Sequence, residues 1–248
     1  MDRNESAPAI VIRSERRGER DRVLTLLSPV WGIRCITVYG AQKSRRAVRA
    51  SLYTEGVFHI YDNRERHQAS LVDVDVITIH ENALSGIASS FAATLMCEIV
   101  IDQKGTEAPA FYELLTGCLD ILEDDNHKRV VTQFIIRALD IAGLSSDYEV
   151  CPVCGRTYAP DEVLGFNDRL ASPCCHTCAS MSVDLILPPN ARRYVRDSLG
   201  VALERAMEYS VSDLMATRLM RYAIRLYRLS CPSSLRSAVA LMELDGLA

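Results

Sequence analysis

Residues 151–178 read CPVCGRTYAPDEVLGFNDRLASPCCHTC and contain two C-x2-C pairs, Cys151 with Cys154 and Cys175 with Cys178, separated by 20 residues. Structural zinc sites hold the ion in a tetrahedron of four ligands, and each C-x2-C turn places two thiolates along one edge of it. Two such pairs at this separation are typical of a structural zinc ribbon. The sequence therefore predicts that these four cysteines bind a structural Zn²⁺ ion. A closed four-thiolate site leaves no open position for zinc catalysis.

Other assignments of these thiols remain open. Cys174 lies four residues before Cys178 and could replace Cys175 in a C-x3-C pair, and His176 could replace a thiolate. The segment could also hold free thiols or two disulfides. The remaining cysteines show no paired spacing, which weakens the disulfide interpretation; they are Cys35, Cys97, Cys118 and Cys231. We expect Cys175 to be the ligand, because it preserves the x2 spacing.

The composition is that of a soluble globular protein, with 248 residues, 48% apolar and 24% charged. This length suits one large domain or two ordinary ones. No run of 18 apolar residues is present, and the polar N-terminus has no apolar core of a signal peptide. Nine cysteines, an odd number, without such a signal favour a reducing compartment. We therefore expect a cytoplasmic protein without a membrane span.

The first 80 residues predict five short strands, because β-branched and apolar residues alternate between turn signals. The expected strands are 9–13, 23–27, 33–39, 52–61 and 70–79. Five strands with tight turns in so short a stretch indicate a small closed barrel. The OB-fold is the five-stranded barrel that binds oligonucleotides.

After Ile79 the apolar period becomes helical. Helical stripes cover 92–99, 111–122 and 131–139, the last ended by Gly143, and further helices follow Pro188-Pro189 and span about 212–229. The predicted fold class is α+β, an N-terminal five-stranded OB-fold barrel followed by an all-α domain with an inserted zinc ribbon-like segment. The expected divisions are a nucleic-acid-binding domain over 1–80, a helical domain over 81–149 and 181–248, and the zinc segment over 150–180.

Positive charge gathers near the N-terminus. Residues 1–50 carry 11 Lys and Arg against 5 Asp and Glu, although the whole chain has a net charge of −4. A loop between two predicted strands supplies Lys43, Ser44, Arg45, Arg46 and Arg49, and the first hairpin adds Arg17 and Arg20. Such side chains suit phosphate oxygens, so we expect them to bind DNA. A solvated charged surface is the alternative.

Several aromatic rings accompany this positive charge and could stack on bases. They are Trp31, Tyr39, Tyr53, Phe58 and Tyr61. Strand alternation points several of them into the barrel, so each ring taken alone is better explained as part of the core.

The last long helix carries a strip of arginines at helical spacing, made of Arg218, Arg221, Arg225 and Arg228. Like charges at this spacing destabilise a helix slightly, and an acidic partner would relieve the repulsion. We expect this strip to dock an acidic peptide with an aromatic end. The alternative is an exposed strip paired with acids elsewhere in the fold.

The usual enzymatic signatures are missing from the sequence. It contains no G-x4-G-K-[ST] phosphate loop, no H-E-x-x-H pair and no G-x-S-x-G elbow. We therefore expect that the protein is not an enzyme.

The order of these parts resembles the bacterial DNA repair protein RecO family. Gly40-Ala41 followed by Lys43-Ser44-Arg45 is similar to the family's G-A-x-K-S-R loop, its most specific local signature. Further similar stretches are Ile10–Arg13 with Gly18–Asp21, Val23–Leu27 with Trp31-Gly32, Phe111–Leu115, Ala138–Leu144, Cys151–Gly155 and Tyr222–Ser237. The resemblance covers nearly the whole chain.

This resemblance implies a DNA repair and recombination mediator of the RecF pathway. Such a protein binds single- and double-stranded DNA, anneals complementary strands without ATP and, with RecR, helps load RecA onto strands coated with single-strand binding protein. The implied partners are RecR, the C-terminal tail of single-strand binding protein and, indirectly, RecA. The implied location is the nucleoid in the cytoplasm, and no membrane partner is expected. The alternative is a zinc-ribbon nucleic-acid-binding or transcription-associated scaffold without annealing activity.

Overall fold

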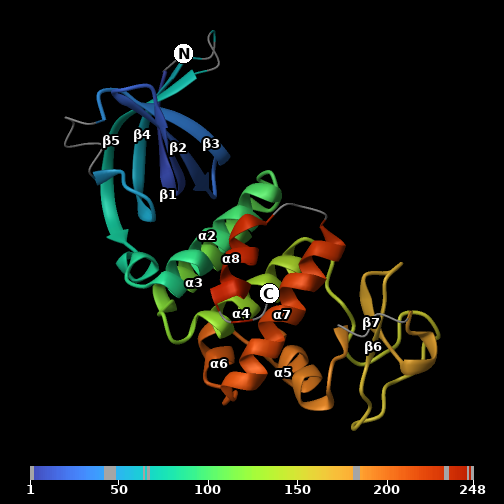
Figure 1. The fold of residues 1–248 in the computed structure, drawn as a ribbon. Coiled ribbons are helices and arrows are strands. Elements are labelled where there is room, and N and C mark those ends of the chain that lie inside the picture. Colours follow the sequence, from blue (N-terminus) through green and yellow to red (C-terminus); the bar gives the residue numbers. More distant parts are fainter. Residues whose placement is uncertain are drawn as a thin grey trace. The chain divides into compact units, whose positions relative to one another are not determined.

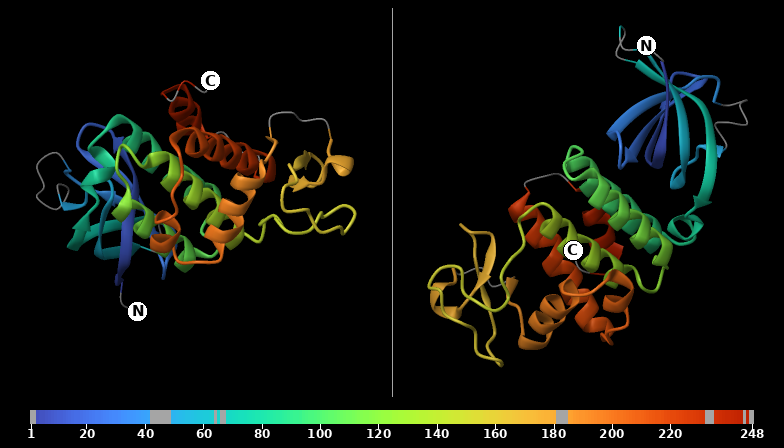
Figure 2. Two further views of the ribbon diagram at one scale, coloured as in Figure 1. Left: turned by 90° about the horizontal axis from the view of Figure 1, so that it is seen from below. Right: turned by 180° about the vertical axis from the view of Figure 1, so that it is seen from behind.

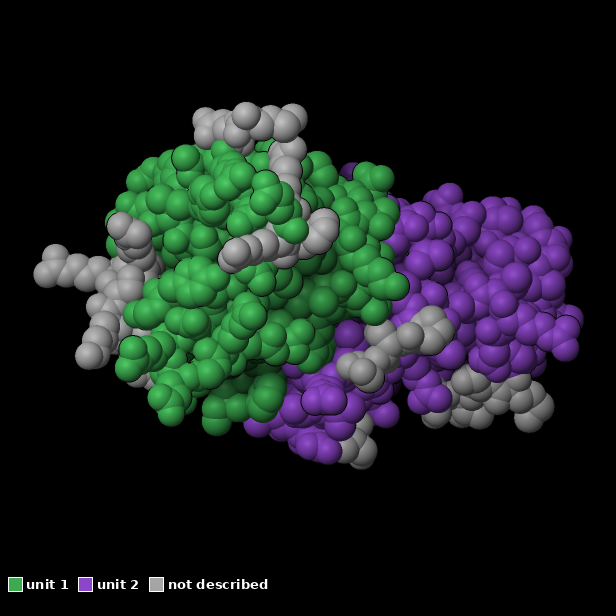
Figure 3. Space-filling model, turned by 90° about the horizontal axis from the view of Figure 1, so that it is seen from above, with its two compact units in different colours: residues 1–124 green, residues 125–248 purple. Residues whose placement is uncertain are grey.

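The computed structural model of the protein describes residues 3–41, 49–63, 65, 68–180, 185–231, 235–244 and 246. The chain divides into two compact units, Met1–Asp124 and Asp125–Ala248, which Figure 3 colours separately. The first unit groups two helices with the strands. The functional division into 1–80, the flanking helical segments and 150–180 stays a prediction.

Five strands near the N-terminus form a closed barrel through four antiparallel pairings and one parallel pairing (Figure 1). Its strands are β1 (Asn4–Arg17), β2 (Asp21–Ser28), β3 (Gly32–Val38), β4 (Thr54–Asn63) and β5 (Gln68–Ile79). Their order is β1-β2-β3-β5-β4, and a parallel pairing of Thr37 with Ser70 closes it. The expected five-stranded barrel of the OB type is confirmed.

Strand β1 is long enough to pair with two strands, β4 and β2. Its first half pairs with β4, from Asn4 opposite Tyr61 to Ile10 opposite Glu55, and its second half pairs with β2, ending with Arg17 opposite Asp21. The second half therefore forms a hairpin arm rich in arginine. The sequence prediction had placed only 9–13 in this strand, because the polar residues that follow lack apolar alternation.

The barrel interior is filled by the inward-facing residues of all five strands, which are fully or almost fully buried: Ala9, Val11, Leu24, Leu26, Ile36, Val38, Phe58, Ile60 and Val74. A bulge between Glu55 and Gly56 bends β4 against β5. A Cβ at Gly56 would lie 2.4 Å from the Asp75 carbonyl oxygen, so only glycine fits this close approach.

Two helices complete the first unit, α2 (Ile87–Asp102) and α3 (Ala108–Ile121), after a 3-10 turn η2 (Glu81–Leu84). A polar cluster around the buried His80 connects the strands to α3: His80 Nδ1 lies 3.0 Å from Asp120 Oδ1, and His80 Nε2 lies 3.3 Å from Glu55 Oε2. Tyr112 Oη donates to Glu55 Oε1 over 2.7 Å. The nearby His80 ring and the Tyr112 hydroxyl lower the pKa of Glu55, so this carboxylate stays charged and holds the end of the barrel to α3.

The second unit is helical. It contains α4 (His127–Ile141), α5 (Pro189–Leu199), α6 (Leu203–Met207), α7 (Asp213–Ser230) and α8 (Arg236–Leu244). Helix α4 packs against α7, and it ends where Gly143 adopts a left-handed conformation at φ +70°. Ser212 caps α7 by accepting from the Met215 amide over 3.4 Å. Within the described ranges, no helix is long and apolar enough to cross a membrane.

The predicted long helices are confirmed, whereas α6 and α8 were not predicted. Between α4 and α5 the chain forms a small inserted segment outside the helices, which both views of Figure 2 show in yellow and orange. It contains the antiparallel strands β6 (Gly165–Asn167) and β7 (Ser172–Cys174) and the 3-10 turn η3 (His176–Cys178). The predicted insertion of a ribbon-like segment into the helical part is confirmed.

Candidate metal centre and DNA-binding surface

The four cysteines of the two C-x2-C pairs converge in the inserted segment. The Sγ atoms of Cys151, Cys154, Cys175 and Cys178 all lie within 4.8 Å of one another, and those of Cys154 and Cys175 are 3.8 Å apart. Zinc–thiolate bonds of about 2.3 Å place the corners of a tetrahedron about 3.8 Å apart. The donor set therefore fits a four-coordinate metal ion of the zinc type.

Short backbone turns shape the knuckles. In the first, the Cys151 amide donates to the Arg156 carbonyl and the Gly155 amide donates to the Cys151 carbonyl, both over 2.9 Å. Gly155 has a φ of +72°, which favours glycine at this position. In the second, the Cys178 amide donates to the Cys175 carbonyl over 3.0 Å. These turns bring the two thiols of each pair to the same side of the chain.

Backbone amides also favour the thiolate form of Cys151. Burial by itself would raise the pKa of Cys151, but hydrogen bonds from the amides of Cys175, Cys154 and Val153 outweigh it and lower the pKa to about 6. Two other pKa values rise, that of Cys174 to about 11 through burial and that of Cys178 to about 12 through the adjacent Cys175 thiol. Thiolates are the metal ligands. The convergence of the Sγ atoms is what groups Cys175, and not Cys174, with the other three cysteines.

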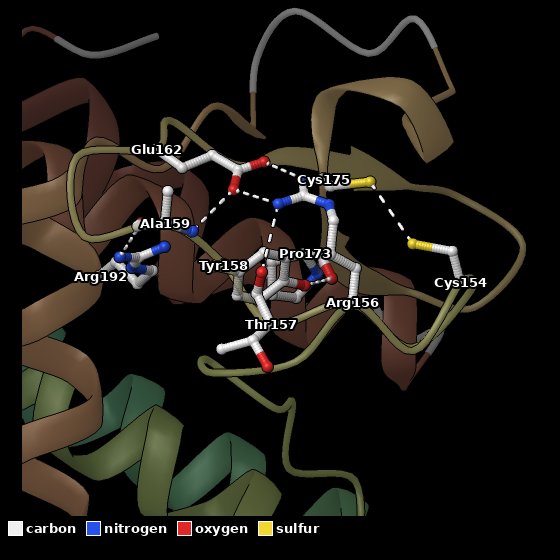
Figure 4. Close-up of polar contacts among 9 residues, drawn as sticks. All are labelled: Cys154, Arg156, Thr157, Tyr158, Ala159, Glu162, Pro173, Cys175 and Arg192. Atoms are coloured by element: carbon white, nitrogen blue, oxygen red, sulfur yellow. Dashed lines mark hydrogen bonds and ion pairs between the residues drawn. The ribbon is translucent and has the colours of Figure 1, made fainter.

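Arg156 lies beside the thiolates (Figure 4). Its Nη1 and Nη2 atoms donate to Glu162 Oε2 and Oε1 over 2.9 and 2.5 Å. The same guanidinium helps to lower the pKa of the Cys175 thiol. Glu162 Oε2 also accepts from the Ala159 amide over 3.0 Å. Arg156 therefore places a positive charge next to a group of thiolates and is itself held in place by Glu162.

Arg192 connects the segment to helix α5 (Figure 4). It is only 4% exposed, and its Nη2 donates to the carbonyls of Ala159 and Pro160 over 2.8 and 3.0 Å. Its guanidinium lies 5.6 Å from the centre of the Tyr158 ring, whose hydroxyl donates to the Pro173 carbonyl over 3.2 Å. One buried side chain on a helix thus holds the loop between the two knuckles.

The predicted DNA-binding residues fall into two groups. Lys43, Ser44, Arg45 and Arg46 lie outside the described residues. Arg49 is exposed and contacts Asp73 Oδ1 over 3.5 Å and the Val74 carbonyl oxygen.

The hairpin arm carries the rest of the predicted surface. Arg17 Nη1 donates to Thr37 Oγ1 over 3.3 Å, and Arg20 is exposed in the turn. Three neighbouring guanidinium groups, those of Arg16, Arg20 and Arg22, have no hydrogen-bond or ion-pair partner within the described part of the chain. These groups can therefore accept an external anion without first breaking an internal pair.

The five rings singled out in the sequence have different environments. Tyr53 and Phe58 are buried in the first unit, whereas Trp31 and Tyr61 are partly exposed. Tyr39 is 61% exposed. Alternation along the strands could not predict which rings are exposed. Tyr39 is exposed because it lies just beyond the end of β3, where alternation no longer applies.

Helix α7 presents its arginine strip to solvent. Arg218, Arg221 and Arg225 are exposed, and Arg228 is partly buried and donates to the Leu235 carbonyl over 3.4 Å. Leu214, one turn before the strip, is 72% exposed. The exposed face of α7 is thus a row of cations that begins with an apolar side chain.

Two family models match successive parts of the sequence. The model described as recombination protein O N terminal matches residues 1–80, and the one described as recombination protein O C terminal matches residues 84–237. The chain belongs to the RecO family.

Curated relatives agree with this assignment. The chain is 26% identical over 200 residues to the DNA repair protein RecO of Listeria welshimeri, covering 77% of this chain and 76% of the relative. It is 28% identical over 153 residues to DNA repair protein RecO of Bifidobacterium animalis subsp. lactis, covering 59% and 64%. Over 200 residues it is 25% identical to DNA repair protein RecO of a Cyanothece species, covering 76% and 66%. The RecO resemblance is confirmed, and with it a role in DNA repair and recombination.

Two residues around the candidate metal centre had no predicted role. Arg156 and Arg192 reach partners that are 6 and 33 residues away along the chain. The only signal in the sequence is the position of Arg156 two residues after Cys154, where a cation can lie near the thiolates.

Replacing Arg156 with alanine should weaken metal binding about 10- to 100-fold, the usual effect of removing a group that supports metal ligands. The variant loses the positive charge beside Cys175 and leaves Glu162 without its bidentate partner. Competition with a chromophoric chelator measures the affinity. Arg169→Ala is the control, because Arg169 is exposed in the same segment and its side chain has no partner within the described part. Equal affinities of wild type and Arg156→Ala would contradict the role of Arg156.

Proposed function

We propose that this RecO-family chain is a recombination mediator of the RecF pathway that binds single- and double-stranded DNA, anneals complementary strands without ATP and, with RecR, helps load RecA onto strands coated with single-strand binding protein. Family membership and the closed five-stranded barrel support the proposal. The observation that carries it is the hairpin arm of the barrel, where Arg16, Arg20 and Arg22 have no partner within the described residues. These are free cations at a surface suited to phosphates.

Annealing requires two phosphate backbones to approach each other. Arginine and lysine side chains that replace condensed counterions lower the repulsion between the strands and gain the entropy of the released ions. Base pairing then drives the reaction, so no nucleotide hydrolysis is needed. The absence of a G-x4-G-K-[ST] loop from the sequence is consistent with this mechanism.

The test is annealing of two complementary labelled oligonucleotides, with and without the protein, at low and moderate salt and without ATP. We expect a salt-sensitive acceleration. No acceleration by a folded, metal-loaded protein would favour the second candidate, a zinc-ribbon nucleic-acid-binding or transcription-associated scaffold. The converging C-x2-C pairs are the observation in favour of that candidate.

We propose Zn²⁺ as the bound metal, with a structural role. Four thiolates suit zinc and saturate its usual coordination, so the ion would connect the two knuckles and leave no site for a substrate. Cys151, Cys154, Cys175 and Cys178 would hold it.

We further propose that the arginine strip of α7 docks the acidic C-terminal tail of single-strand binding protein, with Leu214 next to the aromatic end of the tail. Replacing Arg221 and Arg225 with glutamate should weaken binding of that tail peptide at least tenfold, because hydrogen bonds to charged groups contribute about 1.5–3 kcal/mol. Fluorescence anisotropy of a labelled peptide measures it. Arg193→Glu with Arg205→Glu makes the same change in charge on other helices of the second unit. An unchanged affinity of the Arg221 and Arg225 variant would rule out this docking site.

A further inference from the structure

Tyr39 is an exposed ring at the end of the barrel that carries the basic hairpin. It directly follows Val38, the last residue of β3, and 61% of it is exposed. Its side chain has no hydrogen bond, ion pair or ring contact within the described residues. A large ring so placed contributes little to the packing of the barrel.

The backbone holds this ring next to the arginines. Strand β3 runs antiparallel to β2, with Val38 opposite Arg22, and the Gly40 amide donates to Asp21 Oδ1 over 2.9 Å. The residue between them, Tyr39, is therefore fixed beside the start of β2, where the hairpin turn with Arg20 ends. From β1, on the other side of β2, Arg17 reaches Thr37 over 3.3 Å, so a guanidinium lies two residues from Tyr39 along β3.

Cations and an exposed ring together suit single-stranded nucleic acid. The cations bind phosphates of single strands and duplexes alike, whereas a ring can stack only on a base that is not already stacked within a duplex. The outer face around strands β2 and β3, with the loop between β1 and β2, is also where barrels of this type bind oligonucleotides. Tyr39 and the turn with Arg20 both belong to that region.

We propose that Tyr39 is a base-stacking residue that makes the hairpin end of the barrel prefer single strands to duplex. The proposal rests on the DNA binding proposed above and adds a specificity to it. Because annealing buries the bases within a duplex, the contact with Tyr39 is lost as the product forms. The same ring thus favours binding of the separate strands and release of the duplex.

The test compares Tyr39→Ala, Tyr39→Phe and wild type on three labelled probes: a single strand, an abasic strand of the same length, and a duplex. Stacking on an aromatic side chain strengthens binding about 5- to 150-fold per base. We expect Tyr39→Ala to lose that factor on the single strand, Tyr39→Phe to keep it, and neither to change binding of the abasic strand or the duplex. The salt dependence should stay the same, because tyrosine is uncharged.

Val30→Ala is the matched control, because Val30 is 69% exposed in the turn at the other end of β2 and β3. If wild type binds the single strand and Tyr39→Ala binds it equally well, the stacking proposal is wrong and the DNA-binding proposal stands. An equal loss on the abasic strand also overturns it, because that result shows a general distortion of the site. If wild type binds no single strand, both proposals fail.

Discussion

Cys151→Ser is expected to abolish metal binding and to unfold residues 150–180, because the ion is then left with an incomplete set of thiolates. A structural zinc site contributes about 10–16 kcal/mol of apparent binding free energy, comparable to the roughly 5–15 kcal/mol that stabilise a whole domain. The loss should spread to α5, because Arg192 is buried against Tyr158 and the carbonyls of Ala159 and Pro160. Metal analysis of the purified protein and thermal unfolding with and without a chelator measure both effects.

Two other cysteine variants sharpen this experiment. Cys35→Ser changes an exposed thiol in β3 and should keep one ion per chain. Cys174→Ala should also keep the ion, because Cys174 is not part of the converging group. Loss of metal in Cys174→Ala with retention in Cys175→Ser would reverse the choice between these neighbours. A wild-type protein that is folded and free of zinc would refute the structural role of the metal.

The second large effect is expected from replacing Lys43, Arg45 and Arg46 with alanine. If the wild type neutralises roughly three to five phosphates, the logarithm of its affinity for a single strand falls with the logarithm of salt concentration with a slope of about −2 to −3.5. Removing three cations should weaken binding and flatten the slope to between about 0 and −1.4. Fluorescence anisotropy of a labelled single strand at several salt concentrations gives both quantities.

A matched variant separates a local contact from a change in net charge. Arg193, Arg196 and Arg205 lie on helices of the second unit. Their replacement with alanine also removes three positive charges, but at a different place in the chain. We expect this variant to keep nearly the wild-type slope. Unchanged binding by the Lys43, Arg45 and Arg46 variant would move the DNA site away from this loop.

Much of the fold could be predicted because its signals are local. Alternation along 23–27 or 70–79 and the x2 spacing of Cys151 with Cys154 concern neighbours in the chain. The two missed helices lack such signals: α6 has only five residues, and α8 has only nine and lies beyond the last helix expected, 212–229. Short helices are stabilised by tertiary packing, which a periodic pattern does not reveal.

The site was less predictable, because its supporting contacts join distant residues. Arg192 at first sight is one cation in the run Arg192-Arg193, yet it is buried against Ala159 while Arg193 is exposed. Likewise, the sequence could not distinguish the five rings near the basic residues, of which Tyr53 and Phe58 are buried in the first unit and Tyr39 is exposed. The DNA-binding role of Lys43, Arg45 and Arg46 stays a prediction.

The double pairing of β1 has a consequence for biosynthesis. A ribosome releases β1 before the other four strands, but its first half has no partner until β4 emerges, because Asn4 pairs with Tyr61. Closure also waits for β5, whose pairing of Ser70 with Thr37 joins the last open edge. A nascent chain therefore exposes an unpaired strand edge through most of the synthesis of the first unit, and such edges invite aggregation. We expect the barrel to acquire protease resistance in one step, only after residue 79 has left the exit tunnel.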